Sequence, residues 1–401
     1  MNTGLVEKLQ DRFHELYGVT EHKVFFAPGR VNLIGEHTDY NGGHVFPCAL
    51  SVGTYGMISP RNDDRIRMYS INLPDSGVID LSLQELCPGR THKWSQYPEG
   101  VFWSLMEKGF TFAHGADLMF AGDVPAGSGL SSSASIEVLT GLMIRELYGF
   151  LDLTGIDLAL VGQEAENRYC GMHCGIMDQF SSAMGKEEHA IFLDTETLDY
   201  RLVPLHLGDY ELLIINSHVK HSLVSSAYND RRKECARALD ELKTIRAEED
   251  PSWKEPDHLC ELTPEQFLQH QMVIRDPVVR RRAKHAVFEN HRTIQAVRAL
   301  QEDDIVSFGR LMNESHDSLR DDYEVSCEEI DYLVEVTRGV SGVAGSRITG
   351  GGFGGCTVTV VKKDQVEQLI EEVGQKYLEK FDTEASFYRV KPEDGAHVII
   401  M

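Results

Sequence analysis

The sequence contains no long apolar run. A helix that crosses a bilayer needs about 18 or more consecutive apolar residues, and no such stretch occurs in this chain. The first residues, MNTGLVEKLQDRFHELYG, lack an apolar signal core. Their apolar side chains instead follow helical spacing from Leu5 to Tyr17, with Gly18 at the predicted end. We therefore expect a cytoplasmic protein with no membrane-spanning segment.

Positive charge is also scarce. The chain has 39 lysine and arginine residues against 63 aspartate and glutamate residues, and its formal net charge is -24 at pH 7. This balance disfavours nonspecific binding to nucleic acids or anionic membranes. The basic run RRRAKH (280–285) is spread around a predicted helix that also carries apolar residues, so it indicates a solvated helix face. An anionic substrate would need local positive potential or a divalent cation.

Cysteine is present but too dispersed for a dense disulfide framework, which favours reduced thiols. The tightest group, Cys170, His173 and Cys174, has no second Cys/His pair at zinc-like spacing, and this argues against a zinc site. With 401 residues and 42% hydrophobic content, the chain is long enough for two domains.

Helical and strand-like segments are mixed without strict βαβ alternation, and this predicts an α+β fold. Segments 53–61 and 65–71 alternate like a pair of strands, and segment 115–124 predicts another strand. The region 23–50 reads as strand, irregular loop and strand, punctuated by Pro28 and several glycines. Segment 245–258 is polar and reads as a surface excursion, to which we assign no function. Further helices are predicted at 134–147, 156–171, 230–245, 277–301 and 364–381, and further strands at 211–217 and 386–390. Segment 346–363 is predicted to form a glycine turn followed by an alternating strand.

The segment GDVPAGSGLSSSASIEV (122–138) is a glycine- and serine-rich turn between a strand and a helix, without the lysine that ends the usual phosphate loop. Unpaired N–H groups at a helix start attract anions. Gly127 and Gly129 would let the main chain approach phosphates closely, and Ser131, Ser132 and Ser133 could cap the helix or contact a metal. A capped turn with no ligand explains the pattern equally well.

Three further segments concentrate polar groups or glycine. APGRVNLIGEHTDYNGG (27–43) holds several ionisable groups beside apolar ones, a pattern that suits a polyol. Asp178 follows an Ile-Met pair, and Glu166 lies twelve residues earlier on a predicted helix. These acids could divide metal binding and proton transfer, or they could be ordinary salt-bridged acids. TGGGFGGC (349–356) predicts close approach to a ligand or another loop, with a strained hairpin as the alternative.

Together and in this order, these segments resemble the galactokinase family of the GHMP small-molecule kinases. GRVNLIGEHTDYNGG is similar to the family signature and PAGSGLSSSAS to its nucleotide loop, while CGIMDQF and TGGGFGGC match the remaining motifs. The resemblance runs from about Lys23 to FYRVKP (387–392). It implies a two-domain GHMP kinase fold, with the active site in the cleft between an N-terminal α+β domain (1–205) and a C-terminal one (206–401).

The resemblance further implies ATP-dependent phosphorylation of the C1 hydroxyl of D-galactose, which gives galactose 1-phosphate and ADP and opens the Leloir pathway. It implies that Asp178 and Arg30 are catalytic and that Ser133 and Glu166 bind Mg²⁺. The implied galactose contacts are Glu36, His37, Asp39, Gly175 and Tyr228. The implied ATP contacts are Trp94, Gly127, Ser128, Gly129, Leu130, Ser131, Ser132 and Ser133.

Two alternatives stay open. One is a kinase for another sugar, such as N-acetylgalactosamine or arabinose, with the choice set around Tyr40, Asn41 and Gly43, although HTDYNGG favours galactose. The other is a galactose- and ATP-binding regulator without catalysis, which the intact Ser133-Ala134-Ser135 section disfavours. We expect a monomer whose partners are galactose and MgATP, with no nucleic acid and no membrane.

Overall fold

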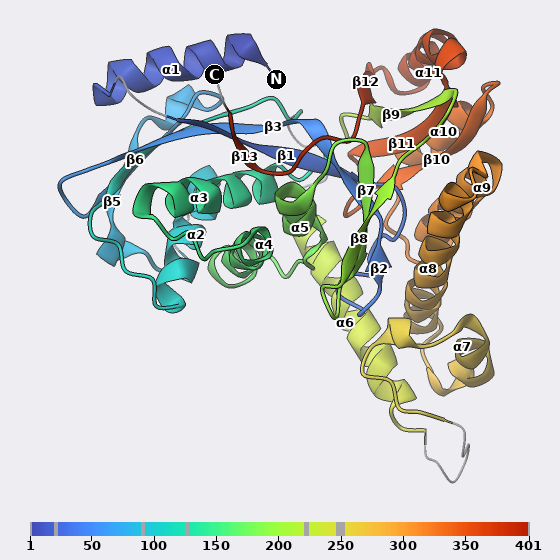
Figure 1. The fold of residues 1–401 in the computed structure, drawn as a ribbon. Helices are drawn as coiled ribbons and strands as arrows, with labels where there is room; N and C mark the ends of the chain where they lie inside the picture. The colour runs from blue at the N-terminus through green and yellow to red at the C-terminus, as the bar shows by residue number, and fades with distance from the viewer. Residues whose placement is uncertain are drawn as a thin grey trace.

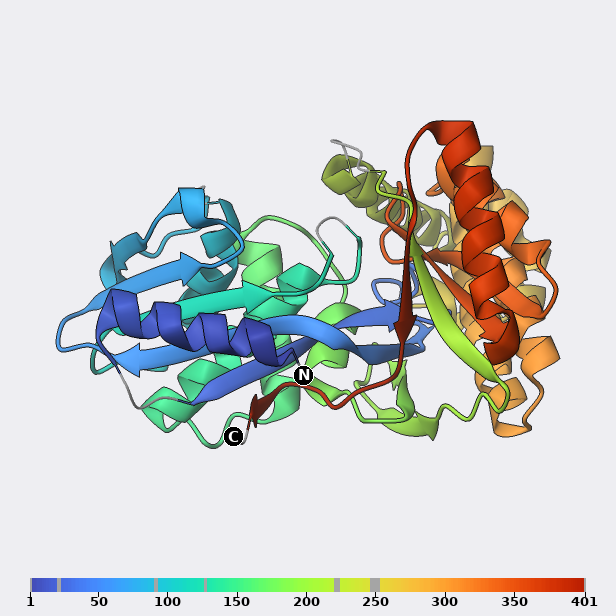
Figure 2. The ribbon, with the colours of Figure 1, turned by 90° about the horizontal axis from the view of Figure 1, so that it is seen from above.

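The computed structural model describes residues 2–19, 23–89, 93–125, 128–219, 224–245 and 253–399. These residues form two lobes that lie side by side, and the mixture of helices and sheets confirms the α+β class (Figures 1 and 2). None of the described helices combines the length and the apolar character that a bilayer crossing requires.

The first lobe is centred on a six-stranded sheet with the strand order β13-β1-β3-β6-β4-β5. Neighbouring strands are antiparallel except β4 and β6, which are parallel. Because helices cover both faces of the sheet, β1 is buried along its whole length. The strands are β1 (Val24–Asn32), β3 (Pro47–Pro60), β4 (Arg65–Ser70), β5 (Ile79–Ser82), β6 (Ala116–Gly122) and β13 (His397–Ile399).

Helix α1 (Thr3–Tyr17) covers one face of this sheet, against which it buries Val6, Leu9 and Phe13 (Figure 1). The helix ends at Gly18, whose φ of 71° only glycine adopts at little cost, as the sequence predicts. The other face packs against apolar side chains of a group of four helices. These are α2 (Gln96–Glu107), α3 (Ser132–Tyr148), α4 (Gly155–Glu164) and α5 (Met177–Met184).

The second lobe contains an antiparallel sheet with the strand order β10-β11-β9-β12. Its strands are β9 (Tyr210–Asn216), β10 (Val343–Thr349), β11 (Cys356–Lys362) and β12 (Ser386–Val390). Its helices are α6 (Val224–Leu242), α7 (Pro264–His270), α8 (Pro277–Gln301), α9 (Ile305–Asp321), α10 (Glu328–Arg338) and α11 (Val366–Phe381). A small third sheet, β2 (His44–Val45), β7 (His189–Asp194) and β8 (Tyr200–Pro204), lies between the lobes in Figure 1.

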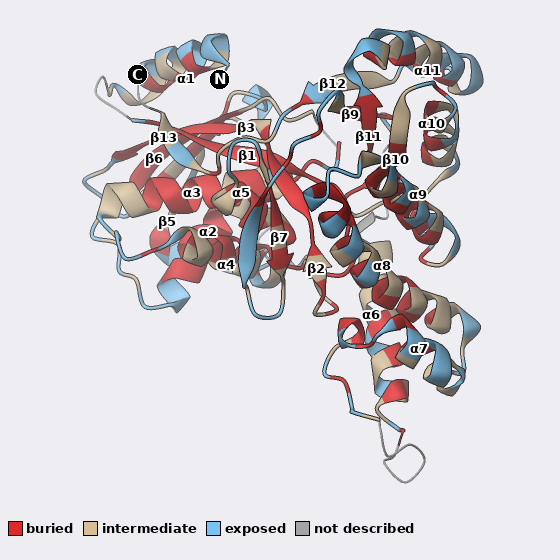
Figure 3. Cartoon of the chain, turned by 45° about the vertical axis from the view of Figure 1, so that its right-hand side comes forward, coloured by how far each residue is buried: buried red, intermediate tan, exposed pale blue. Residues whose placement is uncertain are grey.

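One apolar core joins the two lobes. Val31 and Leu33, at the end of β1, belong to the same buried cluster as Ile214 of β9, Val358 of β11 and Met312 of α9. Figure 3 shows buried strands and helix faces in both lobes. The last strand, β13, returns from the second lobe to pair with β1. The second lobe therefore contacts β1 at both ends, through β13 at its start and through the shared core at its end, where the cavity described below opens.

One strand prediction is wrong. Segments 53–61 and 65–71 do form β3 and β4, but β6 lies between them and pairs with both. Region 23–50 does form a strand, an irregular loop and further strands, and β1 continues through Pro28 and Gly29. A register shift between Pro28 and Arg30 accommodates the proline, which has no N–H for the ladder. Of the polar segment 245–258, residues 246–252 lie outside the described residues.

Candidate active site

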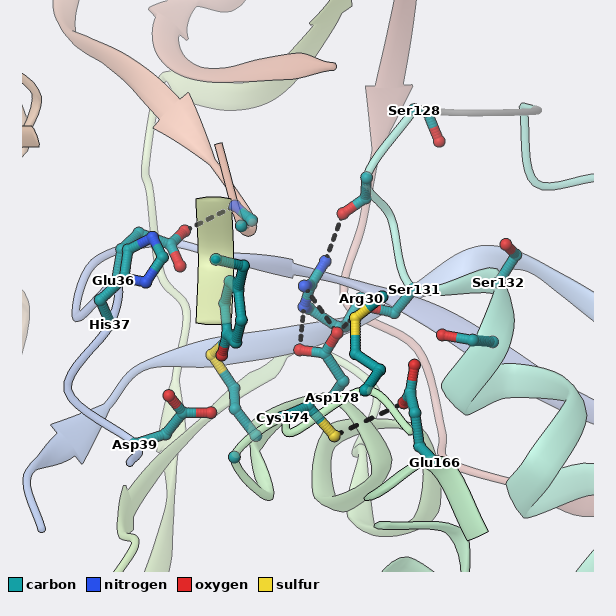
Figure 4. Close-up of a pocket in the computed structure, with 18 of the residues that line it drawn as sticks. Arg30, Glu36, His37, Asp39, Ser128, Ser131, Ser132, Glu166, Cys174 and Asp178 are labelled. Carbon is teal, nitrogen blue, oxygen red and sulfur yellow. Dashed lines mark hydrogen bonds and ion pairs between the residues drawn. The ribbon is translucent and has the colours of Figure 1, made fainter. Parts of the chain in front are cut away.

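A cavity of about 260 Å³ opens between the lobes (Figure 4). Its walls come from β1, the loop after β1, the starts of α3, α5 and α6, and the glycine loop after β10. The predicted site residues that line it are Arg30, Glu36, His37, Asp39, Ser128, Gly129, Ser131, Ser132, Ser133, Glu166, Gly175, Asp178 and Tyr228. Segments more than 200 residues apart in sequence thus meet in one space.

Arg30 and Asp178 form a two-point ion pair at the centre of this cavity. The Arg30 Nε and Nη2 atoms donate to the two carboxylate oxygens of Asp178, each at 2.8 Å. The guanidinium is almost fully buried on β1, whereas the Asp178 side chain keeps 28% of its surface exposed in the first turn of α5. This fork fixes the plane of the carboxylate and leaves an edge of it facing the cavity.

The loop before α3 is tied to the same pair. Arg30 Nη1 donates to the Gly129 carbonyl at 2.6 Å, and the Ser131 hydroxyl donates to Asp178 Oδ2. Ser131 has a φ of 62° and directly precedes α3, so its hydroxyl turns to Asp178 instead of capping the helix. Ser132 and Ser133 fill the first helical turn, whose N–H groups have no carbonyl partner within the helix. The helix start therefore faces the cavity as an anion-binding element.

The other predicted nucleotide contacts lie differently. The hydroxyl of Ser128 is buried and has no hydrogen-bond partner in the described part of the chain, which leaves it available to a ligand. Leu130 belongs to the apolar core, and neither it nor Trp94 is among the described residues that line the cavity. Trp94 packs edge-on against Phe120. Gly127 lies outside the described residues.

Glu166 faces the start of α3 from a π-helical turn, Ala165–Tyr169, that extends α4. Its burial and the nearby charge of Asp178 raise its pKa to about 7, while a hydrogen bond from Ser133 acts in the opposite direction. The Gln179 amide nitrogen donates to Glu166 at 2.7 Å and to the buried Glu137 at 2.9 Å. Burial raises the pKa of Glu137 as well. A cation bound at Glu166 would reduce the electrostatic repulsion among these carboxylates.

The donor chemistry fits Mg²⁺. Among the described residues no group of three or more His, Cys, Asp or Glu side chains is placed to hold one metal. Ser133 and Glu166 would supply two oxygen ligands and leave the remaining positions to water and phosphate oxygens. Mg²⁺ in kinase sites has this preference for few protein ligands.

The loop after β1 supplies the acidic wall opposite the helix start. The Gly350 N–H donates to Glu36 Oε1 at 2.8 Å, and Arg347 lies 3.3 Å from the same oxygen. Burial raises the pKa of Glu36. Burial and the charges of Asp178 and Glu36 raise the pKa of Asp39 to about 7. A Cβ atom on Gly175 would lie 2.0 Å from Asp39 Oδ2, so only glycine fits at this position.

His37 is held in a left-handed backbone conformation, with a φ of 63°. Burial lowers its pKa to about 3, so the imidazole is neutral near pH 7. Its Nδ1 lies 2.7 Å from the Tyr40 hydroxyl, while Nε2 has no hydrogen-bond partner among the residues that the structure describes. Tyr228, in the first half of α6, packs against the ring at a centroid distance of 5.5 Å. This wall thus offers acceptors and neutral polar groups that suit the hydroxyls of a polyol.

The glycine loop 349–356 makes the close approach to another loop that its composition predicts. Gly350 has a φ of 86°, and a Cβ there would lie 2.9 Å from the Gly129 carbonyl oxygen. A Cβ on Gly355 would lie 3.1 Å from the Ser128 carbonyl oxygen. At these two glycines the backbone of the second lobe therefore packs directly against the backbone of the loop before α3.

Four lining residues escaped the sequence reasoning: Tyr97, Met172, Cys174 and Met177. Cys174 and Met177 belong to the CGIMDQF motif itself, so their proximity to Asp178 was a usable signal. Tyr97 lies three residues after Trp94, and it is Tyr97 whose side chain reaches the cavity. Nothing in the local pattern distinguishes which of these two aromatic residues does so.

The bilobal fold, the anion-binding helix start and the arginine-bound aspartate opposite a polyol-type wall define a small-molecule kinase of the GHMP class. Family models agree: the GHMP kinases N terminal domain matches residues 96–186, and the GHMP kinases C terminal domain matches residues 296–380. The galactokinase galactose-binding signature matches residues 11–60. The chain belongs to the galactokinase family.

Relatives of known identity are similar over their full length. Galactokinase of Clostridium acetobutylicum is 48% identical, with 98% of this chain and 99% of the relative covered. That of Bacillus subtilis is 45% identical, with 97% and 98% covered. The crystal structure of Lactococcus lactis galactokinase complexed with galactose has a TM-score of 0.94 at 40% identity, covering 98% of this chain and all of that one. Mevalonate kinase of Methanococcus jannaschii, 18% identical with a TM-score of 0.63, shares the fold.

Proposed function

We propose that this chain transfers the γ-phosphoryl group of ATP to the C1 hydroxyl of D-galactose, with galactose 1-phosphate and ADP as products. Membership of the galactokinase family supports the activity. The observation that carries the assignment of roles is the two-point Arg30–Asp178 pair. It stands between the helix start of α3 and the wall formed by Glu36, His37 and Asp39.

The two substrates divide the cavity. The unpaired N–H groups at the start of α3 and the loop around Gly129 bind the ATP phosphates, which offsets the acidity of the chain for a polyanionic cosubstrate. Glu36, His37, Asp39, Gly175 and Tyr228 bind galactose from the other side. Asp178 lies where the two halves of the cavity meet. It accepts hydrogen bonds from Ser131, in the loop before α3, and from Arg30, on β1.

Asp178 accepts the proton of the attacking hydroxyl. The C1 oxygen forms a bond to the γ-phosphorus while the bond from phosphorus to the β–γ bridging oxygen of ATP breaks, and ADP leaves. A carboxylate is a weak base toward a sugar hydroxyl, but a loose transition state requires little early deprotonation, so the proton moves late. Arg30 orients the carboxylate and stabilises charge that develops on the phosphoryl group.

Ser133 and Glu166 hold Mg²⁺, which when bound neutralises phosphate charge. We expect Glu166→Gln to raise the Mg²⁺ concentration for half-maximal activity by about tenfold or more, since a metal carboxylate ligand is lost. Glu164→Gln is the matched control, because Glu164 lies two positions before Glu166 and pairs with Lys108 and Arg168. Calorimetric titration of Mg²⁺ in the presence of ADP provides a readout independent of turnover. If the metal titration of Glu166→Gln coincides with that of the control, Glu166 is structural.

The decisive experiment is an ADP-release assay with galactose, glucose, N-acetylgalactosamine and arabinose, with and without Mg²⁺. We expect galactose to have the highest kcat/KM and activity to require Mg²⁺. A higher kcat/KM for another of these sugars would overturn the substrate assignment. Absence of product in a single turnover, despite binding of galactose and ATP, would indicate the non-catalytic regulator.

We also infer a domain division near residues 205 and 206. In support, β8 ends at Pro204 in the sheet between the lobes, and β9 of the second sheet begins at Tyr210. Strand β13 is the exception, since it pairs in the first sheet. The active unit is inferred to be a cytoplasmic monomer, and sedimentation velocity at working concentration measures its state.

A further inference from the structure

A chain of four polar side chains leads away from the cavity into the second lobe. His37 Nδ1 lies 2.7 Å from the Tyr40 hydroxyl, which lies 2.8 Å from the Tyr323 hydroxyl. The Tyr323 hydroxyl in turn lies 3.1 Å from Cys235 Sγ. Three separate segments supply these groups: the loop after β1, the residues just after α9, and α6. The chain therefore ties the cavity wall to two elements that do not line the cavity at these positions.

Three of the four members of the chain are buried, and Tyr40 is half-buried. Tyr323 is fully buried, and His37 and Cys235 expose less than a twentieth of their surface. The Tyr323 ring packs between two imidazoles, at centroid distances of 4.8 Å from His37 and 4.5 Å from His285. His285 Nε2 lies 3.1 Å from the Glu36 carbonyl. The ring of Tyr323 is thus fixed independently of its hydroxyl, and removing that hydroxyl leaves the packing in place.

The number of hydrogens along this chain limits the directions in which its hydrogen bonds can run. Each tyrosine hydroxyl carries one hydrogen, and the neutral imidazole carries one N–H. If Nδ1 carries the hydrogen, then Nδ1 donates to Tyr40, Tyr40 donates to Tyr323, and Nε2 is an acceptor. If Tyr323 donates to Tyr40 and Tyr40 donates to Nδ1, Nε2 carries the hydrogen and is a donor. When Tyr40 donates its hydrogen within the chain, the direction of the Tyr40–Tyr323 hydrogen bond fixes what His37 offers at Nε2.

Nε2 is the atom that would meet a ligand. It is buried, it makes no hydrogen bond of normal geometry in the described chain although the Gly351 backbone lies near the ring, and the ring lines the cavity. A buried polar atom in this state gains a hydrogen bond only from a bound molecule of matching donor or acceptor character. A site that presents one fixed tautomer discriminates between sugars more sharply than one that interconverts.

We propose that Tyr323 is a positioning residue that acts through Tyr40 to fix the tautomer and orientation of His37, and so sets the affinity and selectivity for the sugar. This rests on the proposed function, in which His37 contacts galactose. Tyr323 itself is not among the described residues that line the cavity. Its effect is therefore on binding of the sugar and not on the phosphoryl transfer step.

The test is Tyr323→Phe. We expect KM for galactose to rise about fivefold, in the range of one net hydrogen bond. We expect kcat and KM for ATP to change less than about twofold, since neither Asp178 nor the loop before α3 is touched. The preference for galactose over N-acetylgalactosamine should fall in parallel. The matched control is Tyr377→Phe, which removes an equally buried hydroxyl that donates to the Ser217 carbonyl at 3.0 Å. This control should lower the melting temperature and leave KM for galactose unchanged.

Two further measurements make the outcome specific. The double variant Tyr40→Phe/Tyr323→Phe should bind galactose no more weakly than Tyr40→Phe alone, because the two hydroxyls act as one unit. Nitrogen-15 shifts of the His37 ring should show one tautomer in the sugar-free wild type and a mixture in Tyr323→Phe.

Additive losses in the double variant, or an unchanged KM in Tyr323→Phe, would overturn the proposal. A tautomer mixture in the sugar-free wild type would also overturn it, whether or not the variant folds. Failure of the proposed function is distinguishable, because it would be seen first as absent galactose-dependent ADP release by the wild type.

Discussion

Asp178 is held by three contacts that come from two different elements. Arg30 on β1 supplies two of them and Ser131, directly before α3, supplies the third. A carboxylate restrained in this way loses little freedom when a hydroxyl arrives, and preorganisation of this kind lowers the barrier without new contacts. In the proposed mechanism this restrained carboxylate is therefore the side chain on which proton transfer depends.

We expect Asp178→Asn to lower kcat by at least about 100-fold, the lower range for acid–base catalysis, while galactose binding remains measurable. Steady-state kinetics and calorimetric binding of galactose separate these two effects. Asp117→Asn is a matched control, because Arg67 also binds Asp117 at two points, at 2.6 and 2.8 Å, within the first sheet. The control should lose stability but retain kcat. Near-normal turnover by folded Asp178→Asn would remove Asp178 from the proton-accepting role.

Asp39 gives the site a pH-dependent stability. Its pKa of about 7 lies above the value of about 3.9 for aspartate in an unfolded chain. Between these values the folded state keeps a proton that the unfolded state loses, so this contribution to stability falls as the pH rises. Asp39→Asn does not ionise and keeps one acceptor oxygen. Above pH 7 we expect it to melt at least about 2 °C higher than the wild type, with a difference that shrinks toward pH 4.

Thermal melts between pH 4 and 8, without sugar, measure this difference. Asp63 should change stability with pH in the opposite direction, because its hydrogen bond from Arg61 lowers its pKa to about 2. Its contribution is present above about pH 4 and is lost as the pH falls through 2. A pH-independent difference between Asp39→Asn and the wild type would contradict the assigned cause.

At this scale the sequence predicts motif residues well and their neighbours poorly. Arg30 and Asp178 stand inside long motifs, so their meeting in one cavity could be anticipated. Trp94 lies just before α2 and packs on Phe120, whereas Tyr97 in the first turn of α2 lines the cavity, and only the packed structure shows this difference. The Tyr40–Tyr323 contact joins residues 283 positions apart, for which the local pattern holds no information.

Among the elements, the glycine loop 349–356 has the composition that most directly predicts its place in the structure. Its backbone passes so near the loop before α3 that a single added methyl group matters. We expect Gly350→Ala to raise KM for ATP at least about fivefold and to lower the melting temperature. The reason is that the new Cβ would lie 2.9 Å from the Gly129 carbonyl oxygen, at a φ of 86°.

Gly109→Ala is the control that separates the effect of backbone strain from the effect of the contact with the loop before α3. Gly109 has a similar φ of 90°, but no described atom lies within 4 Å of its would-be Cβ. This control should lose about 1–2 kcal/mol of stability from the backbone conformation alone and keep KM for ATP. An equal effect of both variants on KM for ATP would refute the role of loop contact.

Element pairing was the weakest part of the sequence-based fold. The periodicity of 53–61 and 65–71 identifies β3 and β4 correctly, but periodicity carries no information on which strands become neighbours. Strand β6 lies between them and pairs antiparallel with β3 and parallel with β4. Strand β13 is only three residues long, from His397 to Ile399, too short for a period to emerge.

On the scale of the whole molecule, Arg347 connects the lobes. It is fully buried on β10, and its Nη1 donates to the carbonyls of Asn32 and Leu33 at 3.0 and 3.2 Å. Its Nη2 lies 3.3 Å from Glu36. Arginine in the second lobe therefore satisfies backbone and side-chain acceptors of the first, beside the shared apolar core. We accordingly expect the wild type to unfold in a single calorimetric transition.

Arg347→Met should uncouple the lobes. The substitution keeps apolar volume but removes the Arg347 hydrogen bonds to the Asn32 and Leu33 carbonyls. It also removes the positive charge beside Glu36, which keeps its hydrogen bond from the Gly350 N–H. We expect a loss of about 3–5 kcal/mol for the broken buried pair. We expect a lower melting temperature, two resolved transitions, and weaker galactose binding because Glu36 loses the positive charge that lies beside it. Arg338→Met is the control, since Arg338 binds only the Ser346 and Asn313 carbonyls and Asp317 among the described groups, all in the second lobe. It should destabilise the protein and preserve one transition. A single transition in Arg347→Met, with galactose affinity equal to that of the control, would mean that the apolar core alone couples the lobes.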